Sequence, residues 1–161
     1  MALEIERKFL VKNDSWKKNA DRGKRIVQGY VASEKGTVRV RIVGDMAFLT
    51  IKGHSGPNGL SRQEFEYQIP VDDAEKILEE LCNKPFIEKT RYRVAAEDSH
   101  EWEVDVFAGA NNGLVMAEIE LGSEDEVFIL PDWAGEELSS RPEYRNSSLF
   151  RYPYSLWVKN N

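Results

Sequence analysis

The chain has 161 residues, 22 lysines and arginines, 28 aspartates and glutamates, and a formal net charge of -6. This length fits a single domain, residues 1–161, and the acidic balance argues against a general nucleic-acid binder. No stretch approaches the about 20 consecutive apolar residues of a membrane helix, and the N-terminus shows no secretory signal. Cys82 is the single cysteine, which excludes an intramolecular disulfide and predicts a reducing, cytoplasmic setting.

Most of the chain alternates apolar and polar residues with the period of a β-strand. Strands are expected at 3–12, 24–34, 36–43, 46–53, 60–70, 86–96, 101–108 and 114–122. Helices are expected at 14–21, 71–83, 133–139 and 143–150. Asp14 and Asp72 are the expected N-caps of the first two helices. Short strands joined by tight turns indicate a mainly β fold, either an antiparallel sandwich or a barrel.

Seven of these strands carry a polar face that is almost purely charged. Side chains two positions apart share a face of a strand, so same-sign pairs such as Arg39 with Arg41, and Glu118 with Glu120, lie side by side. The basic members are Lys8, Arg39, Arg41, Lys52, Arg62, Lys89, Arg91 and Arg93. The acidic members are Glu4, Glu6, Glu64, Glu66, Glu101, Glu103, Asp105, Glu118 and Glu120.

Two arrangements account for this alternation. In an open antiparallel sheet the polar face meets water, but such faces usually mix uncharged polar residues with lysine. In a closed barrel the charged faces point into the lumen, and the apolar faces pack outward against the helical segments. A lumen that holds both signs of charge suits a phosphate chain bound to a divalent cation. Carboxylates bind Mg²⁺, and arginine and lysine bind phosphate oxygens.

An ordered series of motifs across almost the whole chain resembles the CYTH superfamily, the triphosphate tunnel metalloenzymes. The series is Glu4-Ile5-Glu6-Arg7-Lys8, Gln28-Gly29-Tyr30, Thr37-Val38-Arg39-Val40-Arg41, Leu49-Thr50-Ile51-Lys52-Gly53, Arg62-Gln63-Glu64-Phe65-Glu66, Lys89-Thr90-Arg91-Tyr92, Glu103-Val104-Asp105, Glu118-Ile119-Glu120 and Tyr144-Arg145-Asn146-Ser147-Ser148-Leu149. The resemblance implies an eight-stranded antiparallel closed barrel, or tunnel, with a few helices packed outside and a helical C-terminal segment.

The resemblance also implies a role for each charged set. The phosphates would be held by Lys8, Arg39, Arg41, Lys52, Lys89 and Arg91. Mg²⁺ or Mn²⁺ would be held by Glu4, Glu6, Asp105, Glu118 and Glu120. Glu64 and Glu66 are the candidates to orient the attacking water, and Lys52 joins them as a catalytic candidate. Tyr30 is either a further catalytic residue that positions a lysine or an aromatic that packs against the tunnel wall.

The short bacterial members, mostly inorganic triphosphatases, resemble this chain most. The implied reaction is attack of water on a terminal phosphorus of tripolyphosphate, which releases orthophosphate. The alternatives are a class IV adenylate cyclase, a thiamine or nucleoside triphosphatase, and a non-catalytic polyphosphate-binding module. The expected partner is a small-molecule triphosphate, without nucleic acid or membrane, and a homodimer is left open. One departure is Glu143, which stands where relatives often carry a basic residue.

Overall fold

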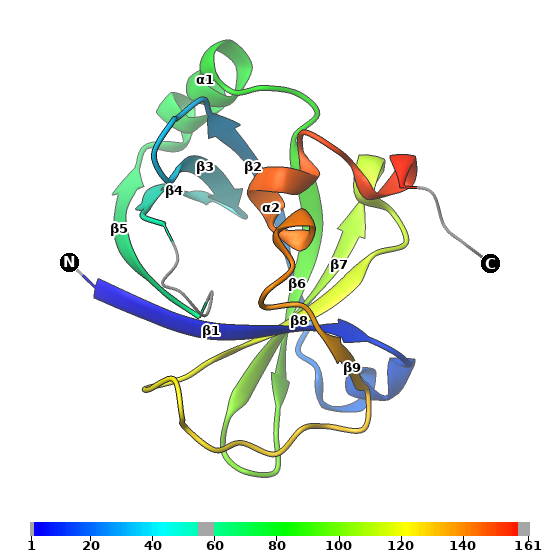
Figure 1. Ribbon diagram of the computed structural model, residues 1–161. Helices are drawn as coiled ribbons and strands as arrows, with labels where there is room; N and C mark the ends of the chain where they lie inside the picture. The colour runs from blue at the N-terminus through cyan, green and yellow to red at the C-terminus, as the bar shows by residue number, and fades with distance from the viewer. Residues whose placement is uncertain (1, 55–59, 158–161) are drawn as a thin grey trace.

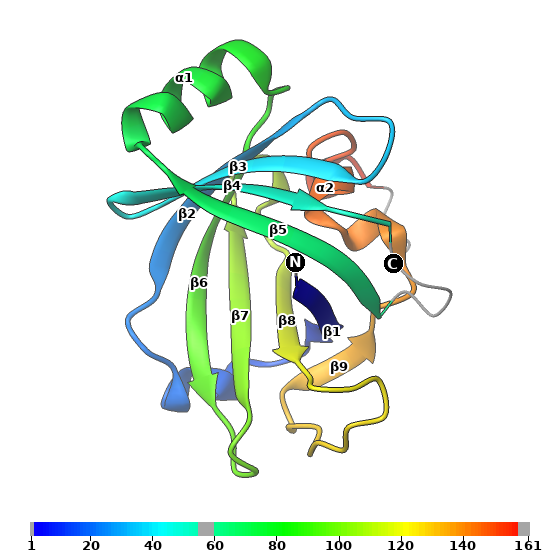
Figure 2. The ribbon, with the colours of Figure 1, turned by 90° about the vertical axis from the view of Figure 1, so that its left-hand side faces the viewer.

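A computed structural model describes residues 2–54 and 60–157. Eight antiparallel strands form a closed barrel in the order β1-β5-β4-β3-β2-β6-β7-β8, because β1 pairs with both β5 and β8 (Figures 1 and 2). The strands are β1 (Ala2–Val11), β2 (Lys24–Val31), β3 (Thr37–Val43), β4 (Met46–Lys52), β5 (Ser61–Ile69), β6 (Ile87–Ala95), β7 (Glu101–Ala108) and β8 (Val115–Glu120). The prediction of a closed barrel is confirmed, and the sandwich is excluded.

The outer faces of the strands are largely apolar, and short elements cover much of them. The helix α1 (Val71–Leu81) packs on β2, β3 and β4, where its Ala74 and Leu78 lie buried against Val40 and Ala47 (Figure 2). A 3₁₀ helix, Asp14–Asn19, inserts Trp16 against Tyr92 of β6, with ring centroids 5.2 Å apart. Because the apolar side chains turn outward to these elements, the charged side chains of the same strands turn into the barrel.

The expected caps are wrong, although the segments form near their expected places. Asn13 caps the 3₁₀ helix, since its side chain accepts from the backbone N–H of Ser15. Pro70 occupies the N-cap position of α1, and Asp72 lies in the first turn instead. There its charge still favours the helix N-terminus through the helix dipole. None of the helices among the described residues has the length and apolar character needed to cross a membrane.

The helix expected at 133–139 is also wrong, because this stretch forms a strand, β9 (Ala134–Glu137). The long strand β1 explains the difference. Its first residues pair with β5, and the end of β1 pairs with β9 through Phe9–Glu137 and Val11–Ala134. An unpaired length of strand edge is a strong template for a further strand, and it overrides the helical spacing of the local sequence.

The C-terminal segment closes one end of the barrel. In place of the single helix expected at 143–150 it contains a 3₁₀ turn, Pro142–Tyr144, and the four-residue helix α2 (Asn146–Leu149), and a second 3₁₀ turn follows at Tyr154–Leu156. Figure 1 shows α2 in front of the opening of the ring of strands, and Figure 2 shows it to one side of the strands. At this end an apolar cluster, called the plug below, fills the barrel. Its buried members are Tyr30, Ile87, Phe107, Leu114, Met116, Leu138, Tyr144, Leu149 and Phe150. The barrel interior is therefore apolar at the plugged end and charged along the rest of its length.

Candidate active site

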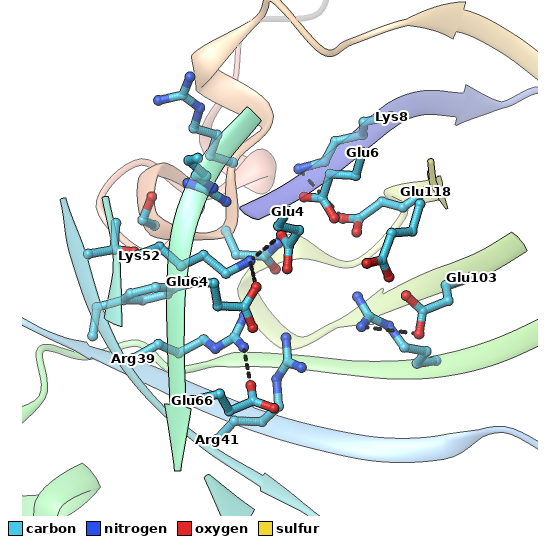
Figure 3. A pocket seen from close by; sticks show the side chains of 18 residues that line it. Glu4, Glu6, Lys8, Arg39, Arg41, Lys52, Glu64, Glu66, Glu103 and Glu118 are labelled. Atoms are coloured by element: carbon cyan, nitrogen blue, oxygen red, sulfur yellow. Dashed lines mark hydrogen bonds and ion pairs between the residues drawn. The ribbon is translucent and has the colours of Figure 1, made fainter. Parts of the chain in front are cut away.

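The charged part of the barrel interior forms a cavity of about 200 Å³ (Figure 3). The basic side chains that line it are Lys8, Arg39, Arg41, Lys52, Arg62, Arg91 and Arg145. The acidic side chains are Glu4, Glu6, Glu64, Glu66, Glu103, Glu118 and Glu120. The remaining lining residues are Tyr30, Thr37, Asn146 and Ser147. Seven positive and seven negative groups therefore surround one small space, which excludes the reading of these faces as an open solvated surface.

All but two of the predicted site residues line this cavity. Lys89 and Asp105 instead lie behind its wall, with exposed fractions of 0% and 2%. Two further charged residues follow the same strand register but fall outside the cavity. Arg93 and Glu101 form an ion pair at 3.8 Å, with both side chains more than half exposed.

Carboxylates from β1 and β8 face each other across one side of the cavity. Glu6 lies opposite Glu120 in the strand register, and Lys8 lies opposite Glu118 at an N–O distance of 3.7 Å. Burial, reinforced by Glu118 and Glu4, raises the pKa of Glu6 to about 7. Burial acts in the same direction on Glu118, but Lys8 and Arg91 outweigh it and hold the pKa of Glu118 to about 2. At Glu6, burial and the neighbouring carboxylates thus outweigh Lys52 and Lys8.

These carboxylates have the chemistry of a divalent cation site. Carboxylate oxygens are hard ligands that Mg²⁺ and Mn²⁺ prefer. A cation would offset the burial, and the repulsion from Glu118 and Glu4, that raise the pKa of Glu6. In the arrangement shown, Glu118 is paired with Lys8 and Glu4 with Lys52. Within residues 2–54 and 60–157, no three acidic, histidine or cysteine side chains converge closely enough to hold a metal ion as they stand. The type and charge of these residues suit a divalent cation, although their side chains are not arranged as a complete coordination shell.

On the opposite side, β3, β4 and β5 contribute a chain of paired charges (Figure 3). Lys52 Nζ lies 2.9 Å from Glu4 Oε1 and 3.7 Å from Glu64 Oε2. Arg39 donates to the hydroxyl of the buried Thr50, which donates in turn to Glu66 at 2.8 Å. Two buried polar atoms here, Arg39 Nε and Glu64 Oε2, have no hydrogen-bond partner among residues 2–54 and 60–157. Buried polar atoms are rarely left unpaired, so they mark a place for a polar ligand or water.

The β6–β7 wall is held by one buried aspartate. Asp105 accepts from Lys89 at 2.7 Å and takes a two-point contact from Arg91 at 2.7 and 2.8 Å. Burial would raise the pKa of Asp105, but the two cations hold that pKa well below its usual range. Burial also lowers the pKa of Lys89 to about 7, although Asp105 opposes this. Asp105 therefore fixes Arg91 in a direction from which it reaches the cavity.

Several polar residues of the site were not among the predicted ones. Thr37 lies two positions before Arg39 on β3 and shares its inward face. The alternation of the strand could therefore have predicted it. Asn146 and Ser147 reach the cavity from the start of α2, and Asn146 accepts from Lys89 Nζ at 3.2 Å. The alternation of a strand does not predict these two, because they come from the segment that folds back into the barrel.

A closed antiparallel barrel whose lumen carries both cations and carboxylates defines a tunnel protein for a polyanion and a metal ion. The chain belongs to the CYTH domain family, whose model matches residues 2–150. It is 50% identical over 155 residues to an inorganic triphosphatase from Acetivibrio thermocellus, covering 96% of this chain and 97% of that one. It is 37% identical to an inorganic triphosphatase from Nitrosomonas europaea, covering 91% and 95%. The crystal structure of the inorganic triphosphatase NE1496 is similar, with a TM-score of 0.65 and 33% identity over 97% of this chain and 99% of that one.

Proposed function

We propose that this protein is a metal-dependent triphosphatase that hydrolyses inorganic tripolyphosphate to pyrophosphate and orthophosphate. One observation carries the proposal. The cavity places seven cationic and seven carboxylate side chains around about 200 Å³, a balance that a polyanion and a divalent cation satisfy together. The names of the two relatives support the same substrate. Tyr30 is the one aromatic side chain among the described residues that line the cavity, which gives little surface for a nucleoside base.

The basic side chains bind the phosphate chain. Lys8, Arg39, Arg41, Lys52 and Arg91 line the cavity and supply charge-assisted hydrogen bonds to phosphate oxygens. They also stabilise the negative charge that builds up on the phosphoryl oxygens in the transition state. Lys89 acts from behind the wall through Asp105, which it shares with Arg91.

The carboxylates divide into two groups. Glu4, Glu6, Glu118 and Glu120 would hold Mg²⁺ or Mn²⁺, and Asp105 serves mainly to hold its two cations. A divalent cation bound here supplies neutralisation of phosphate charge and a fixed orientation of the phosphate chain. Glu64 and Glu66 are left to orient the attacking water. Glu64 is the stronger candidate, since one of its buried oxygens has no hydrogen-bond partner in the part of the chain that the structure describes.

The test is release of orthophosphate and pyrophosphate from tripolyphosphate, with ATP measured in parallel, in Mg²⁺, in Mn²⁺ and in EDTA. The proposal requires metal-dependent orthophosphate from tripolyphosphate at a rate well above that from ATP. Pyrophosphate from ATP without orthophosphate would show a cyclase instead. Tight tripolyphosphate binding with no hydrolysis in any metal would show a binding module.

Glu6→Gln is the matched variant for this assay. It keeps the shape of the side chain but removes the charge that a cation needs. We expect turnover to fall by at least about 100-fold, the upper end of the cost of losing a supporting residue at a metal site. Glu101→Gln is the control, because Glu101 lies on a charged strand face outside the cavity. Equal activity in the two variants would remove Glu6 from the metal site.

A further inference from the structure

A buried glutamine links two residues of the tunnel wall. Gln28 of β2 is 0% exposed and lies directly opposite Arg41 of β3 in the strand register. Its side-chain carbonyl oxygen accepts from Arg41 Nε at 2.9 Å, and its amide nitrogen lies 2.9 Å from the hydroxyl oxygen of Tyr30. Both Arg41 and Tyr30 line the cavity, whereas Gln28 does not.

The chemistry of the partners fixes the direction of both hydrogen bonds. The Nε–H of an arginine can only donate, so the oxygen end of the Gln28 amide must face it. The NH₂ end of the amide must then face Tyr30, and it donates to the hydroxyl oxygen. A hydroxyl that accepts on this side keeps its own proton for another direction.

That remaining direction leads toward the cavity. No acceptor for the Tyr30 proton is found within the part of the chain that the structure describes, and the tyrosine ring is fixed by stacking on Phe150 at 5.2 Å. Burial raises the pKa of Tyr30, so the hydroxyl keeps its proton at neutral pH. Arg41 is fixed in the same way, because the bond to Gln28 engages Nε and leaves both Nη groups for the cavity (Figure 3).

We propose that Gln28 is a positioning residue, which orients the Tyr30 hydroxyl as a hydrogen-bond donor to a phosphate oxygen and aims the guanidinium of Arg41 at the same phosphate chain. The inference rests on the proposed function, because it names a donor for the triphosphate that the tunnel binds. The proposal gives the Tyr30 hydroxyl a binding role in addition to the packing of the ring. The position of the ring is set by Phe150, and the direction of its O–H is set by Gln28.

Gln28→Glu tests this with little change of shape. A carboxylate only accepts hydrogen bonds, so it keeps the contact with Arg41. It also accepts a hydrogen bond from the Tyr30 hydroxyl, which turns the O–H away from the cavity. We expect kcat for tripolyphosphate to fall at least about tenfold, as for loss of one hydrogen bond to a charged group, with a smaller change in KM. Wild-type kcat in Q28E would overturn the proposal.

A double-mutant cycle with Tyr30→Phe distinguishes the proton from the added charge. Tyr30→Phe removes the donor itself, so adding Q28E to it should cost less than about twofold more, because the two changes remove the same interaction. An undiminished loss in the Tyr30→Phe background would overturn the proposal, since the new carboxylate would then act directly on the phosphates. If Q28E does not fold, Gln28→Met replaces it in the cycle. Because methionine also removes the contact with Arg41, the proposal then requires that the loss of kcat is smaller in the Tyr30→Phe background than in the wild type.

The same four proteins are compared in calorimetric titrations with tripolyphosphate in EDTA. This readout is independent of hydrolysis. It requires that any loss of affinity caused by Q28E is smaller in the Tyr30→Phe background than in the wild type. If the wild type binds tripolyphosphate without hydrolysing it, the proposed function fails while the coupling still decides the role of Gln28. If tripolyphosphate does not bind at all, both proposals are overturned.

Discussion

Arg39 is held in the tunnel wall by contacts that leave part of its guanidinium group available. Its Nη2 donates to Thr50 at 3.2 Å and lies 3.7 Å from Glu66, and its buried Nε has no hydrogen-bond partner among the described residues. The side chain is only 10% exposed, so water screens its charge weakly. A phosphate oxygen that reaches this group therefore gains a charge-assisted hydrogen bond.

We expect Arg39→Ala to weaken tripolyphosphate binding by about 1.5–3 kcal/mol, the usual value of a hydrogen bond to a charged group. Calorimetric titration of tripolyphosphate in EDTA measures this loss. Arg93→Ala is the matched control, because Arg93 follows the same strand pattern but forms an exposed pair with Glu101, and such pairs contribute below about 1 kcal/mol. Equal losses in the two variants would show that charge, and not position in the cavity, controls binding.

At the scale of elements, the plug joins the C-terminal segment to the barrel. Leu149 of α2 is 0% exposed and packs in the cluster that contains Ile87, Phe107 and Met116. Leu149→Ala should lower the free energy of unfolding by about 2–5 kcal/mol, as for other buried leucines. Denaturant titration measures it. Leu156→Ala makes the same chemical change where the side chain is 62% exposed, and it should cost less than about 0.5 kcal/mol. A stability loss shared by both variants would contradict the packing role of α2.

A histidine clasp holds the loop between β8 and β9. His100 Nε2 lies 2.5 Å from Glu126, and its Nδ1 lies 3.0 Å from Asp98. Glu126 and then Asp98 raise the pKa of His100, while the hydrogen bond from His100 lowers the pKa of Glu126. A raised histidine pKa in the folded state means that the protonated clasp stabilises fully below about pH 6.5 and loses this contribution as pH rises through the folded pKa.

His100→Asn should therefore lower the melting temperature most near pH 6, and the difference from wild type should shrink toward pH 9. Thermal unfolding at a series of pH values measures the difference between the two proteins directly. The expected change has this sign because only the protonated ring carries an N–H for each of the two carboxylates and a positive charge that attracts both. A constant difference across the series would show that His100 acts by packing alone, for example against Phe128.

Strand alternation predicted which side chains share a face, but it left an open sheet and a closed barrel both possible. The almost purely charged faces favoured the barrel, and the family resemblance implied it. Strand alternation could not report how far along a face the cavity extends. Lys89 and Arg93 follow the same register as Arg91, yet one is buried behind the wall and the other is exposed outside. Nor could it predict β9 or the cavity contacts of Asn146, because both depend on chain segments distant in sequence.

At the scale of the whole molecule, the charge of the tunnel is balanced although the chain carries a net charge of -6. Seven cationic and seven carboxylate side chains line the cavity. A phosphate chain alone would make this small space negative, and a divalent cation alone would make it positive. Because charges interact more strongly inside a protein than in water, each ligand should favour binding of the other.

We therefore expect Mg²⁺ and an imido-bridged tripolyphosphate analogue that resists hydrolysis to stabilise the protein cooperatively. A ligand at 100 times its dissociation constant stabilises by about 2.7 kcal/mol, which corresponds to roughly 5–11 °C in melting temperature for a domain of this size. The rise in melting temperature with both ligands should exceed the summed rises with each ligand alone.

Mg²⁺ also binds the analogue in solution, so Glu6→Gln is the control. It leaves solution chemistry unchanged but removes a carboxylate whose pKa is raised by burial and by the neighbouring Glu118 and Glu4. Cooperativity that persists unchanged in Glu6→Gln would place the cation on the analogue alone and not between the analogue and the carboxylates of β1.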